Sequence, residues 1–106
     1  MDITVHIIPN EDANPPGKLA DAELRFTGGL LDGLRLVGFA VWQSPTRGRN
    51  VTFPARTYRV LGEPRAYALL RPLTEAANTD RVRDHILQAY AAYEHYTQQS
   101  EEAASV

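Results

Sequence analysis

Arginines are concentrated in the middle of this 106-residue chain. Residues 33–72 contain seven arginines and no lysine against a single acidic residue, which gives this segment a formal charge of +6. Residues 1–32 and 73–106 each carry a formal charge of −4, so the whole chain sums to only −2. The planar guanidinium group suits bidentate recognition of phosphates and base edges. This distribution indicates an anionic partner, or a match between the acidic and basic parts of neighbouring molecules.

Four of these arginines lie where turns or loops are expected. Arg47 and Arg49 flank a glycine, and Arg56 and Arg59 follow Pro54 in a segment that we expect to be exposed. Such a cluster can contact phosphates while its loops reach into a groove. We therefore predict a nucleic-acid interface here. The alternative is a solvated surface whose charges pair weakly with the acidic ends of the same chain.

The other residue types that carry chemistry form no recognisable catalytic or metal-binding motif. The chain has no cysteine, which excludes disulfides, thiol nucleophiles and thiolate metal sites. His6, His85 and His95 do not have the spacing of a zinc site, and neither Ser44 nor Ser100 lies in a G-x-S-x-G motif. The glycines match neither a dinucleotide-binding motif nor a P-loop. We therefore expect no catalytic residue, metal, cofactor or small-molecule substrate, and no enzymatic activity.

The composition is that of one globular domain, with 43% hydrophobic and 23% charged residues. No window approaches the 18 or more apolar residues of a membrane-spanning helix. The N-terminal residues also lack the basic and long apolar regions of a secretory signal. We therefore expect a cytoplasmic protein without a membrane partner.

About five strands are predicted in the N-terminal two-thirds of the chain. Apolar and polar residues alternate in the first two of them, which is typical of half-solvated antiparallel strands. Gly38, inside the most apolar run, indicates a bulge or a close backbone approach. The basic segment 55–65 contains a glycine and a proline and is expected to be broken. The predicted strands cover residues 2–8, 18–27, 34–42, 51–53 and 66–70.

One helix is predicted after the strands, over residues 79–97. Asn78 or Thr79 can cap it, and apolar residues recur along it at helical spacing. A single domain is therefore expected over residues 1–97, followed by a polar tail over 98–106 that frays. The order predicts an α+β fold, with a twisted antiparallel sheet and one C-terminal helix packed on it.

A homodimer is predicted because one sheet and one helix leave the second face of the sheet uncovered. If Gly38 does not bulge, Phe39 and Val41 lie on that second face, which is then too apolar to remain in water. Tyr90 and Tyr93 share one face of the predicted helix, and such aromatic faces often mark core or interface positions. We therefore assign Phe39, Val41, Tyr90 and Tyr93 to the dimer interface.

The order of elements and several motifs resemble the SpoVG family of small bacterial regulators over roughly residues 2–96. The opening ITVHII is similar to the first strand of the family, and ADAELRFTGGLLDGLRLVGFAVW to its central hairpin. QSPTRGRNVTFPART resembles the glycine turn, short strand and basic loop, with Gly48, Val51 and Pro54 at matching positions. YALLRPLTEAANTDRVRDHILQAY resembles the last strand and the helix.

The resemblance implies a homodimer with a twisted antiparallel sheet, a C-terminal helix and DNA binding, and in some members RNA binding. It places the loop after the matching proline, Ala55, Arg56 and Thr57, in the interface. We therefore expect a dimeric DNA-binding regulatory protein. The alternative is a protein-interaction module, an adaptor or inhibitor that uses the same basic loops. The predicted contacts to nucleic acid are Arg47, Arg49, Arg56, Thr57 and Arg59.

Overall fold

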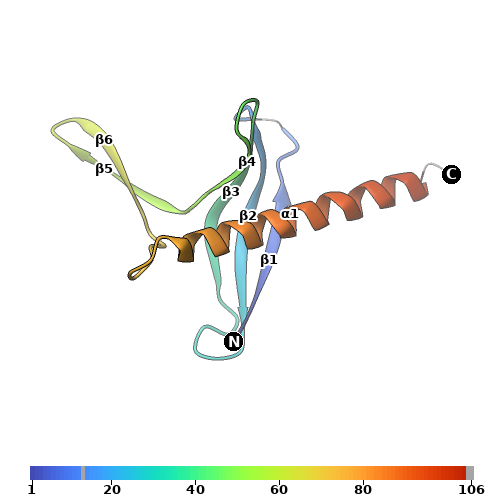
Figure 1. The fold of residues 1–106 in the computed structure, drawn as a ribbon, viewed down its shortest axis with the longest axis horizontal. Coiled ribbons are helices and arrows are strands. Elements are labelled where there is room, and N and C mark those ends of the chain that lie inside the picture. Colours follow the sequence, from blue (N-terminus) through green and yellow to red (C-terminus); the bar gives the residue numbers. More distant parts are fainter. Residues whose placement is uncertain (13, 105–106) are drawn as a thin grey trace.

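The chain folds as a four-stranded antiparallel sheet, a separate two-stranded hairpin and one long C-terminal helix (Figure 1). This computed structural model describes residues 1–12 and 14–104, with side chains as far as residue 98. The predicted α+β class is confirmed, with the strands divided between two sheets. The elements are β1 (Asp2–Pro9), β2 (Lys18–Thr27), β3 (Arg35–Ser44), β4 (Gly48–Thr52), β5 (Ala55–Val60), β6 (Glu63–Ala68) and α1 (Ala77–Ala104).

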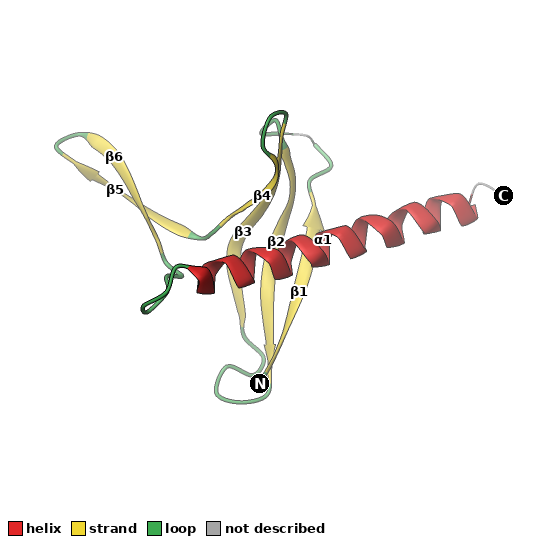
Figure 2. Ribbon diagram, in the orientation of Figure 1, coloured by secondary structure: helices red, strands yellow, loops and turns green. Residues whose placement is uncertain are grey.

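The main sheet has the order β1-β2-β3-β4, and α1 crosses one of its two faces (Figure 2). Alternate residues of the strands point to the same face, which explains why the alternation in the sequence places apolar side chains under the helix. The register aligns them in rows, for example Val5 with Leu24 and Ala20 with Val41. The buried core consists of Ile7, Ala20, Ala22, Leu24, Phe39, Val41, Val51, Ile86 and Tyr90.

Gly38 lies in a β-bulge, one of the two features that the sequence indicated at this position. Between the pairs Ala22–Phe39 and Leu24–Leu36, β3 has one residue more than β2, and the register shifts there. Gly38 has a φ of 109°, a backbone conformation that residues with a Cβ rarely adopt. The extra residue shifts the pairing of β3 with β2 by one position. Side chains of β3 after the bulge therefore point to the opposite face from the one that an unbroken strand would give them.

The bulge corrects the expected position of the interface residues. Phe39 and Val41 have no exposed surface because they point toward α1 rather than toward the open face of the sheet. Tyr90 packs on them from the helix and is only 8% exposed, and Tyr93 lies at the edge of the same cluster. Phe39, Val41 and Tyr90 are therefore core residues, and they offer no surface to a second copy while α1 occupies this position.

Strands β5 and β6 form a hairpin that projects from the rest of the molecule, and we call residues 55–68 the arm (Figure 1). This hairpin was not predicted, because segment 55–65 was expected to be broken and the last strand was placed at 66–70. All of β5 and all of β6 except Ala68 are exposed. The Leu69 N–H donates to the Pro54 carbonyl oxygen over 2.9 Å and closes the base of the arm.

Helix α1 is longer than predicted at both ends. It begins at Ala77 rather than residue 79, and it continues to Ala104 through much of the segment expected to fray. Figure 1 shows that its last turns extend beyond the edge of the sheet. Within the described residues, no helix combines the length and apolar character that crossing a bilayer requires.

Candidate nucleic-acid interface

One face of the arm carries alternating arginine and tyrosine side chains. The register of the hairpin sets Arg56 opposite Tyr67 and Tyr58 opposite Arg65, and directly opposed residues share a face. The two tyrosine rings meet edge to face, with their centroids 5.8 Å apart. All four residues are exposed. We call these four residues the Arg/Tyr face.

A further arginine adds to the positive charge of the Arg/Tyr face. The guanidinium carbon of Arg71, just beyond the arm, lies 5.7 Å from the centroid of the Tyr67 ring, within cation–π range. Glu63 provides the only acidic side chain of the arm. Its Oε2 lies 3.7 Å from the Nη2 of Arg65. Both partners of this pair are largely exposed, so the pair contributes little and is easily exchanged for another partner.

The Arg/Tyr face combines the two side-chain types that bind nucleic acid without catalysis. Arginine binds phosphate oxygens in a bidentate manner and also reaches guanine edges. Tyrosine rings offer flat surfaces on which unpaired bases stack. A two-stranded β-ribbon also has the width that the major groove of B-form DNA admits.

The opposite face of the arm holds the other two residues predicted on this segment. Thr57 pairs with Ala66 and Arg59 pairs with Pro64, so both point away from the Arg/Tyr face. The Arg59 Nη1 donates to the carbonyl oxygen of Gly62 over 3.3 Å. The structure thus divides the predicted group of Arg56, Thr57 and Arg59 between two faces.

Arg49 lies apart from the arm and joins the sheet to the helix. Its Nη2 donates to the Glu94 Oε2 over 2.7 Å, and its guanidinium carbon lies 5.0 Å from the centroid of the Tyr90 ring. The hydrogen bond to Glu94 raises the pKa of Arg49, and burial raises the pKa of the Tyr90 hydroxyl. This arginine is therefore occupied by a contact between β4 and α1.

Arg47 lies in the turn between β3 and β4, which projects separately from the arm (Figure 1). Its backbone N–H donates to the Ser44 Oγ over 3.2 Å, and its side chain lines a polar hollow of about 710 Å³ beside Trp42. Among the described residues, no carboxylate lies within ion-pair distance of Arg47 or Arg56. The predicted arginines thus occupy three places: Arg47 lies in the β3–β4 turn, Arg49 lies between β4 and α1, and Arg56 and Arg59 lie on the arm.

Arg35 belongs to the basic segment but faces a carboxylate on the open face of the sheet. Glu23 is only 4% exposed, and its Oε1 accepts from the Arg25 Nε over 2.8 Å and from the Arg35 Nη1 over 3.4 Å. The hydrogen bond from Arg25 lowers the pKa of Glu23, against the opposing effect of its burial. Arg35 is therefore partly neutralised.

Three residues of the Arg/Tyr face were absent from the sequence prediction: Tyr58, Arg65 and Tyr67. A signal for them exists, because Arg-Thr-Tyr at 56–58 and Arg-Ala-Tyr at 65–67 repeat the same alternation on both sides of Leu61-Gly62. A hairpin with its turn at these two residues places both arginines and both tyrosines on one face.

Metal binding finds no support in the part of the chain that the structure describes, where no three histidine or acidic side chains cluster around a common point. Comparisons of the chain with protein-family models, with characterised proteins and with solved structures found no match. The resemblance to the SpoVG family therefore stays a prediction.

Proposed function

We propose that this chain is a non-enzymatic, cytoplasmic regulatory protein that binds DNA, or RNA, as a homodimer. One observation carries the proposal: an exposed hairpin that presents arginine and tyrosine alternately on a single face. The resemblance to the SpoVG family supports the same function, and membership of that family is part of the proposal.

The exposure of the arm supports a binding role. An isolated two-stranded hairpin is only marginally stable in water. The arm nevertheless places its tyrosines and arginines in solvent, where they gain little from burial within the chain. A bound nucleic acid would cover the rings and give the guanidinium groups phosphate partners, with release of counterions from the nucleic acid.

The test compares two double variants by fluorescence anisotropy with a labelled mixed-sequence duplex at several salt concentrations. Arg56→Ala with Arg65→Ala should weaken binding about tenfold at low salt and reduce the slope of log K against log salt by about 2. Lys18→Ala with Arg83→Ala removes the same charge from ion pairs outside the arm. This control should bind nearly as well as the wild-type chain.

Equal losses in both variants would show that only net charge matters, and an unchanged affinity in the arm variant would remove the arm from the interface. A wild-type chain that binds no nucleic acid at low salt would overturn the proposal. The alternative, a protein-interaction module that uses the same arm, then becomes the better account. A specific partner retained after nuclease treatment would identify it.

A further inference from the structure

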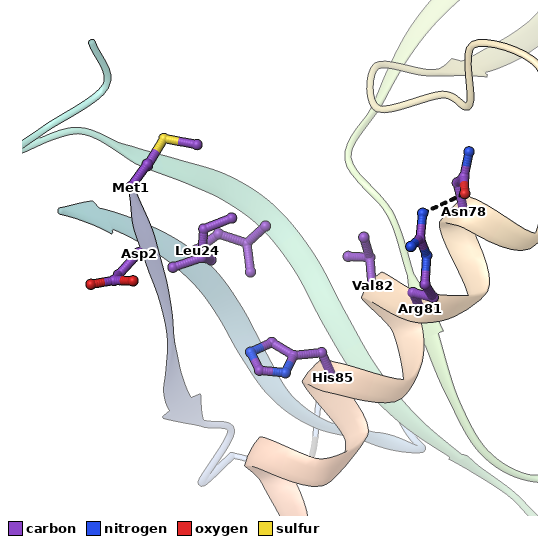
Figure 3. Close-up of a pocket in the computed structure, with 8 residues that line it drawn as sticks. Met1, Asp2, Leu24, Asn78, Arg81, Val82 and His85 are labelled. Carbon is purple, nitrogen blue, oxygen red and sulfur yellow. Dashed lines mark hydrogen bonds between the residues drawn. The ribbon is translucent and has the colours of Figure 1, made fainter. Parts of the chain in front are cut away.

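An apolar groove runs along the end of the sheet that α1 leaves uncovered. Figure 3 shows one part of it, about 560 Å³ in volume, between the first turns of the helix and the start of β1. Arg81 and His85 stand at its rim. It continues, through shared residues, into a trough of about 510 Å³. The trough is lined by Ile3, Leu24, Phe26, Leu31, Leu34, Arg35, Leu36, Leu70 and Val82.

The trough leaves large apolar side chains in solvent. All of its lining residues except Arg35 are apolar, and Leu34 is 57% exposed and Ile3 44% exposed. Ile3 and Leu34 lie on the same face of the sheet as the core residues. The apolar side chains of this face therefore continue past the edge of α1, where the helix no longer covers them. A contiguous apolar surface of this kind marks an interaction site.

The tip of the arm projects where the trough is hollow, and it is apolar like the trough. Leu61 is fully exposed, and the neighbouring Val60 is 43% exposed. Leu61 has a φ of 51°, in the left-handed region that is unfavourable for a residue with a Cβ. A leucine at this position gains nothing within one copy of the chain, where a glycine or asparagine would fit the backbone better.

Charge also matches between the tip and the trough. Glu63 follows the turn at the tip, and its side chain is 75% exposed. Arg81 lines the pocket that adjoins the trough. A tip that enters the trough can therefore bring its carboxylate toward Arg81.

The molecule is more extended than a compact domain of its length. Its radius of gyration is 16.2 Å, and its longest dimension is 59 Å. A compact domain of about 100 residues has a radius of gyration of about 13 Å. The projecting arm contributes to this extension (Figure 1). Exchange of arms between two copies would cover the tip and the trough together.

We propose that, in the homodimer, the arm tip of each copy, Val60 and Leu61, docks in the apolar trough of the other copy. A two-fold axis makes the two contacts equivalent, so each dimer gains both. The inference rests on the dimeric part of the proposed function. The proposed contact uses Val60 and Leu61 and none of the four residues of the Arg/Tyr face, although Val60 points to the same side of the hairpin.

Disulfide trapping tests the contact directly, because the natural chain has no cysteine. A Leu61→Cys chain is mixed with a larger, tagged Leu34→Cys chain and oxidised, and the mixed disulfide is measured on a non-reducing gel. The control replaces Leu34→Cys by Leu73→Cys, which is 99% exposed and outside the trough. We expect several-fold more mixed product with Leu34→Cys. Equal yields in the two mixtures would overturn the docking geometry.

Light scattering after size exclusion gives the second readout. The wild-type chain should be a dimer, and Leu61→Asp should shift it to monomer without change in its circular dichroism, since Leu61 has no contacts to lose in the single copy. A monomeric wild-type chain, or a dimer that Leu61→Asp leaves intact, would overturn the inference. DNA binding is measured separately, so its loss with trapping intact would count against the proposed function alone.

Discussion

Glu23 organises the open face of the sheet. Its nearly buried carboxylate lies between Arg25 and Arg35, which are directly opposed on β2 and β3. Two like charges opposite each other destabilise a sheet unless a counter-charge lies between them. The hydrogen bond from Arg25 stabilises the charged carboxylate and lowers the pKa of Glu23 below its ordinary value of 4.5.

This interaction predicts a loss of stability in acid. A carboxylate whose pKa is lower in the folded chain than in the unfolded chain stabilises the fold at neutral pH. That contribution disappears as the pH falls below 4.5 and through the folded-state pKa. Urea unfolding at a series of pH values should show the free energy of unfolding falling over this range, and Glu23→Gln should flatten the curve.

Arg25→Gln should flatten the same part of the curve, because it removes the main hydrogen-bond donor to Glu23. If Glu23→Gln keeps the full wild-type pH dependence between neutral and acid conditions, the ion pair is not what stabilises this face.

The bulge at Gly38 determines which side chains of β3 lie under the helix. A Cβ built at Gly38 would lie 2.8 Å from the Cβ of Pro54, closer than such atoms approach. Pro54 is buried at the point where the chain leaves β4 for the arm. The bulge therefore permits the burial of Phe39 under the helix. The missing Cβ of Gly38 leaves room for Pro54, where the chain turns from β4 into the arm.

Gly38→Ala should be far more destabilising than substitution of an equally unusual glycine in open space. Strain and the contact with Pro54 together should cost about 3 kcal/mol in the free energy of unfolding. Gly33, with a φ of 81°, has no atom within 4 Å of a built Cβ, so Gly33→Ala should cost only about 1 kcal/mol. Chemical denaturation of both variants would measure the difference, and equal losses would argue against the close approach.

The sequence predicted those elements whose pattern is local. The alternation in 2–8 and 18–27 predicted β1 and β2 almost to the residue, and Gly38 indicated a bulge or a close backbone approach at its position. The faces of β3 were wrong for Phe39 and Val41, since they depended on whether the bulge forms. Only the cross-strand register settles this, and a single sequence does not contain it.

The arm was missed because Gly62 and Pro64 were interpreted as interruptions. Gly62 instead forms the turn with Leu61, and Pro64 is tolerated because a proline can lie in an edge strand. Arg56 is the predicted contact that belongs to the Arg/Tyr face. Tyr58, Arg65 and Tyr67 could be assigned to this face only once the pairing of β5 with β6 was known. The helix continues past the predicted end because alanine, glutamine and glutamate are all good helix formers.

On the scale of the whole molecule, the seven arginines of the middle segment are distributed over several separate places. Arg35 is bound to Glu23, and Arg49 is bound to Glu94 under the helix. The arm keeps three arginines against one glutamate and projects from the body of the molecule. The fold thus neutralises Arg35 and Arg49, leaves Arg47 in the β3–β4 turn, and presents three arginines on one exposed hairpin. We propose that this hairpin binds nucleic acid on its Arg/Tyr face and a second copy at its tip.

The most direct test removes the arm and leaves the body of the protein intact. The Leu69 N–H already bonds to the Pro54 carbonyl oxygen, so an Asn-Gly turn can replace residues 55–68 with little change at the base. Anisotropy with a labelled duplex at low salt would compare this chain with the wild type and with Leu61→Asp, which keeps the Arg/Tyr face. Our account predicts that the armless chain folds but loses nearly all binding. The monomeric Leu61→Asp chain should bind more weakly than the wild-type dimer but far more tightly than the armless chain, because it keeps one Arg/Tyr face. An armless chain that is folded and binds as tightly as the wild type would contradict it.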